Sequence, residues 1–190
     1  METEARLKRA SAKKQIAKKA VSMASTLHEM SEMIVKRKAD GWWQFPAEPE
    51  VEGFMGTGQF IVGDQPSTSD WEEKNRNRRA FYDLLPRIGV GNAHLTDFYK
   101  RRGKSGTLRK RIHANEIPAD LMEHIEFLRA EIALLNPSRI VALGHDAHWL
   151  LKRYVPEVLP ILSRMWHFSY VVRCNKTAFY EDNARVAFRL

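Results

Sequence analysis

The chain is poor in cysteine and has no long apolar run, and each absence excludes classes of protein. Cys174 is the only cysteine among 190 residues, which excludes an internal disulfide and any zinc or iron–sulfur site built from several cysteines. No stretch is apolar over the about 20 residues that a membrane helix needs. The charged first residues lack the apolar segment of a secretory signal. We therefore expect a cytoplasmic protein without a metal, a cofactor or a membrane partner.

Acidic residues are also in deficit. The 23 Asp and Glu stand against 31 Lys and Arg, so the formal net charge is +8 at pH 7. This excess favours a polyanionic partner such as a nucleic acid, although a basic composition alone is a weak signal. Hydrophobic residues make up 44% of the chain. That content and the length fit a monomer with one domain and an extension.

The extension is expected to comprise residues 1–57. Residues 5–37 predict one long helix, because apolar residues recur at spacings of three and four. The start of this helix is strongly basic, so it either packs on the domain as a solvated helix or lies along phosphates, and both can hold. Residues 38–57 lack helical periodicity and predict a connector, with Trp42 and Trp43 packed onto the domain.

Strands and helices alternate in the remaining domain, residues 58–190, and no internal repeat is visible. The pattern predicts a three-layer α/β/α fold with a central, mostly parallel four-stranded sheet, in addition to the long N-terminal helix. The predicted strands cover 58–63, 92–98, 138–143 and 160–166, and the predicted helices cover 76–87, 118–135, 145–154 and 176–188.

Polar residues follow two of these strands, where parallel sheets commonly build sites. In residues 63–71 (GDQPSTSDW), Gly63 lets the backbone approach a ligand, and Asp64 and Gln65 place polar side chains at a strand end. The same residues also fit a simple capped turn. In residues 167–173 (HFSYVVR), His167 could donate to a developing anion or could be a satisfied structural histidine.

A third loop combines an acid with dense positive charge. Asp97 lies where the 92–98 strand emerges, and residues 100–111 contain seven Lys or Arg and no acid. Unopposed charge beside a pocket suits phosphate binding, whereas the alternative is a flexible, solvated loop.

Taken together, these segments resemble the uracil-DNA glycosylase superfamily over residues 58–190. Residues 63–67 (GDQPS) are similar to its G-E-A-P-G or G-I-N-P-G motif, and residues 95–102 (LTDFYKRR) to a strand such as I-T-N-V-V-K-C-R. Residues 137–144 (PSRIVALG) are similar to P-K-V-I-V-A-L-G, and residues 167–173 to H-P-S-Y-L-L-R. The chain differs from the family at Gln65, where the best-known members carry Asp, at Asp97, where they carry Asn, and at Phe168, where they carry Pro.

The resemblance implies a monofunctional glycosylase of base-excision repair, associated with the nucleoid, that flips a base out of DNA and hydrolyses its bond to the sugar. Gln65, His167 and Asp64 would be catalytic: His167 donates to the base, and Gln65 with nearby amides positions water. The remaining residues would bind the base (Asp97, Trp71, Gly63, Ser67) or the DNA (Ser169, Val171, Val172, Arg173, Lys100, Arg101, Arg102).

Asp97 leaves the identity of the base open. An amide matches both the acceptor and the N–H of uracil, whereas an ionised carboxylate can only accept. Asp97 therefore reads the N–H alone, stays protonated in a dry pocket, or selects another base, such as one with an exocyclic amino group.

Other functions remain as alternatives. The same fold could serve as a non-catalytic DNA or RNA clamp. A nucleophilic hydrolase lacks its G-x-S-x-G motif, and residues 53–58 (GFMGTG) precede a strand rather than follow it, which is wrong for a phosphate loop. His145, Asp146 and His148 could bind a metal, but the start of a capped helix explains them better.

Overall fold

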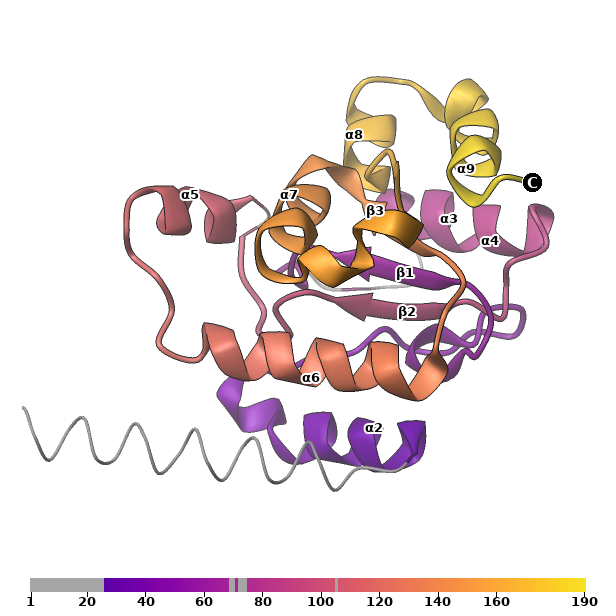
Figure 1. Cartoon of the computed structure of the whole chain (residues 1–190). Helices are drawn as coiled ribbons and strands as arrows, with labels where there is room; N and C mark the ends of the chain where they lie inside the picture. Colours follow the sequence, from indigo (N-terminus) through magenta and orange to yellow (C-terminus); the bar gives the residue numbers. More distant parts are fainter. Residues whose placement is uncertain (1–25, 69–70, 72–74, 105) are drawn as a thin grey trace, which may run out of the picture.

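A sheet of four short parallel strands forms the centre of the molecule. The computed structural model describes residues 26–68, 71, 75–104 and 106–190 (Figure 1). The strands are β1 (Phe60–Gly63), β2 (His94–Asp97), β3 (Ile140–Leu143) and β4 (Leu162–Met165), and they pair in the order β2-β1-β3-β4. The predicted three-layer fold with a four-stranded sheet is confirmed, and every strand pairing is parallel.

Both faces of the sheet are covered, which is why the two central strands, β1 and β3, are nearly continuous apolar runs. Phe60 and Val62 face a core formed with helices α5 (Thr107–His113), α6 (Leu121–Leu135) and α7 (Gly144–Tyr154). Ile61 faces the opposite core, built with α3 (Arg76–Tyr82), α4 (Leu84–Arg87), α8 (Phe168–Arg173) and α9 (Tyr180–Phe188). Figure 1 shows α6 on one side of the sheet and α3, α4 and α9 on the other.

The order of the strands creates a crevice at one edge of the sheet. The chain leaves β1 through α3 and α4 on one face, and it leaves β3 through α7 on the other. Adjacent connections that run to opposite faces leave a gap outside the carboxyl ends of their strands. The carboxyl ends of β1 and β3 are therefore where a ligand site is expected.

The N-terminal extension is described only from residue 26. Helix α2 (Leu27–Lys36) begins with a capping box, in which Thr26 has extended backbone and exchanges hydrogen bonds with Glu29. Its buried face packs with Phe54 and Phe127, so that α2 lies outside α6 (Figure 1). The predicted helix over 5–37 is thus confirmed only for its last third, and the rest lies outside the described residues.

The connector is tied to the domain by its tryptophans, as predicted. The Trp42 ring stacks on His124 at 4.4 Å, with the Arg37 guanidinium 4.0 Å from the Trp42 ring centroid. The backbone N–H of Trp43 donates to the carbonyl of Lys100 at 2.9 Å. Two short 3-10 turns, η1 (Lys38–Asp40) and η2 (Gly53–Met55), complete the connector.

Several elements differ from the sequence-based expectation. Helix α5 lies within the expected basic loop, and α8 lies where a loop after the last strand was expected. The predicted helix over 76–87 is divided at Asp83 into α3 and α4, and two turns, η3 (Pro156–Ile161) and η4 (Thr177–Phe179), precede β4 and α9. Within the described residues, no helix is long and apolar enough to cross a bilayer.

Candidate functional site

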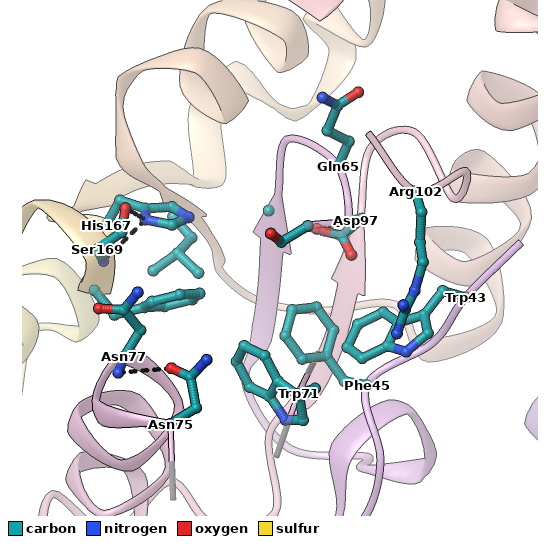
Figure 2. Close-up of a pocket in the computed structure, with 14 residues that line it drawn as sticks. Trp43, Phe45, Gln65, Trp71, Asn75, Asn77, Asp97, Arg102, His167 and Ser169 are labelled. Atoms are coloured by element: carbon teal, nitrogen blue, oxygen red, sulfur yellow. Dashed lines mark hydrogen bonds between the residues drawn. The ribbon is translucent and has the colours of Figure 1, made fainter. Parts of the chain in front are cut away.

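A small pocket of about 100 Å³ lies at the predicted crevice and receives a residue from each strand end. Gly63 ends β1, Asp97 ends β2, Leu143 ends β3, and His167 follows β4 (Figure 2). The volume is below the about 300 Å³ of a drug-sized site, so the pocket suits one small planar group. Eight of the residues predicted from the sequence line it: Gly63, Gln65, Ser67, Trp71, Asp97, Arg102, His167 and Ser169.

Asp97 is placed by the absence of a side chain at Gly63. A Cβ added to Gly63 would overlap the Asp97 Oδ1 atom, so the carboxyl group occupies the space that any larger residue would fill. Asp97 is only 4% exposed, and its Oδ2 atom has no hydrogen-bond partner among the described residues. A buried polar atom without a partner is costly, and here it lies in the wall of the pocket.

The surroundings of Asp97 favour its neutral form. Burial raises the pKa of Asp97 well above its usual value, and the nearby acids Asp64 and Glu131 raise it further, while Lys100 opposes them. The Lys100 ammonium is largely committed elsewhere, because it donates to Glu131 at 2.9 Å and to the Asp97 carbonyl at 2.7 Å. The pocket therefore presents a carboxyl group whose neutral form is favoured more than in a solvated aspartate.

His167 faces the pocket as a neutral imidazole. Its Nδ1 atom accepts a hydrogen bond from the backbone N–H of Ser169 at 3.2 Å and lies 2.7 Å from the Ser169 hydroxyl. His167 is thus the N-cap of α8. Since Nδ1 is an acceptor, the proton of the neutral ring resides on Nε2. Burial lowers the pKa of His167 to about 4; Asp146 opposes this effect and Arg173 adds to it. The ring is thus a preset N–H donor.

Aromatic side chains form the floor of the pocket. Trp71 meets Phe45, Phe168 and Trp43 edge to face, with ring centroids 5.9, 5.7 and 6.0 Å apart. Figure 2 shows Trp71, Phe45 and Trp43 below Asp97, with His167 and Ser169 on the left of the pocket. The Arg102 guanidinium lies 5.8 Å from the Trp43 ring centroid. An apolar floor beneath a few polar groups is the usual composition of a small-molecule site.

Gln65 lines the pocket, but its side-chain amide holds the segment before α5 in place. The Gln65 amide nitrogen donates to the Lys104 carbonyl at 2.5 Å and to the Thr107 hydroxyl at 2.9 Å, and Figure 2 shows the side chain turned away from Asp97. The backbone of Ser67 forms an isolated parallel β-bridge with that of Gly103. The loop therefore fixes the segment that leads into α5, and the Gln65 side chain is not directed at a pocket ligand.

Three residues expected to contact DNA are committed to structural contacts instead. Lys100 is 1% exposed and forms an ion pair with Glu131, so it cannot reach a phosphate. Val171 is fully buried in the core beside α3, so its side chain cannot insert between DNA bases. Arg101 donates to the Asp40 carbonyl at 2.8 Å and pairs with Asp120 at 3.3 Å.

The other expected residues lie at or beyond the rim. Asp64 accepts a hydrogen bond from the Gly106 N–H at 3.2 Å and faces a neighbouring, larger cleft, as does the exposed Arg173. Burial raises the pKa of Asp64, and hydrogen bonds from backbone amides oppose this effect. Val172 is partly buried and lines neither cavity. Asp64 is therefore not positioned inside the small pocket.

Sequence reasoning missed six residues that line the pocket: Trp43, Phe45, Asn75, Asn77, Leu143 and Phe168. Only the helix-capping pattern could have indicated one of them, since Asn75 accepts from the Asn77 and Arg78 N–H groups and so starts α3. The connector residues carry no such signal. Their position depends on backbone bonds between residues 41–43 and 100–102.

The candidate metal ligands do not form a site. Among the described residues, no group of three or more metal-binding side chains comes together. His145 and Asp146 instead contact Arg109, whose Nη1 atom lies 2.6 and 3.0 Å from them.

The fold is that of an α/β protein, and its small pocket lies at the point where the strand order reverses. No protein-family model matches the chain, and comparison with curated proteins finds no match either. The geometry of the pocket therefore carries the functional argument.

Proposed function

We propose that the protein is a DNA glycosylase that excises uracil or a related base. The observation that carries this proposal is the pairing of two groups in one small aromatic pocket: the buried Asp97 carboxyl with a free oxygen, and the neutral His167 with its Nε2–H directed outward from α8. A carboxyl group that keeps its proton can donate to one atom of a base edge and accept from the next. A flipped base would lie against the Trp71 and Phe45 floor.

Leaving-group stabilisation would be the main contribution of the protein to catalysis. Negative charge grows on the base as its bond to the sugar breaks, and a donor already oriented toward it costs little reorganisation. His167 can supply that donor without first losing a proton, because burial keeps its ring neutral. The dry, aromatic surroundings would strengthen the interaction.

A single substitution separates this role of His167 from its role as a cap. His167→Asn keeps an oxygen that can accept from the Ser169 N–H, but its amide N–H groups lie on a shorter side chain and do not reach as far as the imidazole Nε2. We expect His167→Asn to lower the rate of uracil release from uracil-containing single- and double-stranded oligonucleotides by about 10²–10³-fold. Alkali-induced strand breaks measure the release. Release of uracil, hypoxanthine or xanthine by neither the wild type nor any variant would refute the proposal.

One observation favours a second function, a DNA clamp that retains the glycosylase fold. The Gln65 side chain is bound to Lys104 and Thr107, and Asp64 faces the neighbouring cleft. Asp97 is therefore the only acid that lines the pocket among the described residues, and burial raises its pKa, which disfavours an ionised base for activating water. Binding of DNA with no base released in the same assay would identify the clamp.

A further inference from the structure

The larger cleft beside the pocket carries positive charge that no other described residue neutralises. It has a volume of about 780 Å³ and shares Leu143, His167 and Ser169 with the pocket. Lys110 of α5, Arg164 of β4 and Arg173 of α8 are exposed and line it. None of the three side chains forms an ion pair or hydrogen bond with a described residue, and the cation that pairs with Asp146 is Arg109. Three elements thus direct free cations into one cavity.

The acids of the cleft do not cancel this charge. Asp146 is paired with Arg109 at 3.0 Å. The Asp64 carboxylate accepts from the Gly106 N–H, and its burial favours the protonated form. Three cations therefore remain available to an anionic ligand, which is the electrostatic footprint of a track for phosphates.

Two aromatic side chains line the cleft together with these cations. Trp166 and Tyr170 line the same cleft, with ring centroids 5.9 Å apart in an edge-to-face arrangement. Tyr170 is 38% exposed, although it sits beside the fully buried Val171. Free cations together with exposed aromatic faces are typical of proteins that bind single strands, because unpaired bases can stack on the rings while the phosphates meet the cations.

The two valines of α8 are not placed to open a duplex. Proteins that kink or open a duplex frequently insert an apolar side chain between its base pairs. Val171 is buried and Val172 is partly buried, so neither projects from α8 as a wedge. Bases within a duplex also stack on each other and do not offer their faces to Tyr170.

We propose that this cleft is a binding track for single-stranded DNA, and that it leads a base of the strand to the pocket at His167. The proposal rests on the proposed function only for the fate of that base. Binding of the strand itself depends on the cleft alone, so undamaged DNA tests it.

Fluorescence anisotropy with a labelled oligothymidylate of about 16 nucleotides, and with the duplex of the same strand, tests the preference. We expect tighter binding of the single strand. Lys110→Gln, Arg164→Gln and Arg173→Gln should each reduce the slope of log K against log salt by about 0.7. Lys38→Gln is the matched control and should leave the slope unchanged. Lys38 is exposed on η1, which follows α2 directly along the chain, and Figure 1 shows α2 far from α8.

The aromatic contribution has its own matched pair. Tyr170→Ala should weaken binding of oligothymidylate about 5- to 150-fold, whereas Tyr170→Phe, which keeps the ring, should bind like the wild type. Equal or tighter binding of the duplex, or cation variants that behave like Lys38→Gln, would overturn the proposal. Circular dichroism confirms that each variant is folded.

The exposed thiol of Cys174, which follows Arg173 and is the only cysteine, allows a second test. A photoactivated cross-linker on Cys174 should capture oligothymidylate, and the same reagent on Lys38→Cys in a Cys174→Ser background should not. Equal capture at both positions would also overturn the proposal. If cleft variants lose binding while no base is ever released, the proposed function fails and the track stands; if bases are released and cleft variants bind normally, the reverse holds.

Discussion

The pKa values of Asp97 and His167 both depart from those of the same residues in water. Burial is the first cause in both, and it acts in opposite directions: it raises the pKa of the Asp97 carboxyl and lowers that of the His167 imidazole. Both groups therefore tend toward the neutral form, so the pocket can receive a neutral heterocycle without paying to strip water from an ion. Strongly perturbed titratable groups that converge in a cleft often mark a functional site.

The Asp97 carboxyl should reduce stability at neutral pH. Its pKa is higher in the folded state, so the unfolded chain releases the proton first, and the wild type loses stability as pH rises from about 4. Asp97→Asn does not titrate and should be more stable than the wild type in urea unfolding, by a margin that grows between pH 4.5 and pH 8. Glu116→Gln, at an exposed acid, should show no growing margin. A variant less stable than the wild type at pH 8 would contradict the expected cost of the buried acid.

His167 should have the opposite effect on the pH dependence of stability, because its contribution is lost as the pH falls. Its pKa is about 4 in the folded protein against about 6.5 in the unfolded chain. The stabilisation is complete above about 6.5 and is lost as pH falls toward 4, because only the unfolded chain takes up the proton. His167→Asn should therefore lose less stability than the wild type between pH 7 and pH 4.5. Parallel thermal unfolding curves for both proteins across that range would contradict this.

Among the elements, the loops that connect strands to helices decide the shape of the site more than the helices do. The 63–67 loop is joined to the segment before α5 by the Gln65 amide and by the Ser67 bridge, and the connector is joined to residues 100–102 by backbone bonds. Each junction brings together segments that are distant in sequence. The pocket is thus closed by pairs of loops rather than by one motif.

Gln65→Met tests whether this junction is structural. The substitution keeps the length of the side chain but removes the donors to Lys104 and Thr107, which should cost about 1–3 kcal/mol of stability. Hydrogen exchange should become faster at the amides around Thr107, while amides of β3 keep their protection. If base release falls as much as in His167→Asn at a temperature where the protein is fully folded, Gln65 acts in the chemistry instead.

The helices and strands were largely predictable from the sequence, but the contacts between loops that close the pocket were not. Apolar runs at β1 and β3, alternating with helical periods, indicate a covered parallel sheet. The polar residues at the ends of β1 and β2 and after β4 were expected at one edge of the sheet, and there they line one pocket. Burial of Lys100 was not visible, because its partner Glu131 lies 31 residues away on α6. Helix α8 was missed because its six residues show too little periodicity, although His167 caps it.

Across the whole molecule, positive charge is unevenly distributed. Residues 1–25 contain seven Lys or Arg and two Glu, and the cations of the cleft lie on the described domain. Charge far from the specific contacts mainly strengthens binding without sequence preference. The N-terminal residues would then add affinity, while the cleft and the pocket would add selection.

Deletion of residues 1–25 checks this division. The capping box at Thr26 allows α2 to begin without residues before it, so the melting temperature should stay within a few degrees. Binding of oligothymidylate should weaken, with a shallower salt dependence, while the ratio of single-strand to duplex affinity is kept. Loss of that ratio on deletion would assign the preference to the N-terminal residues.

The contact between Gly63 and Asp97 has a consequence for how the pocket can change in evolution. The Asp97 carboxyl group fills the space that a methyl group at position 63 would occupy. Aspartate at position 97 therefore requires glycine at position 63. A lineage could place alanine at position 63 only after shortening position 97, and it would give up the reading group in doing so. A double-mutant cycle of Gly63→Ala and Asp97→Ser should accordingly show the pair to be more stable than the sum of the single changes predicts.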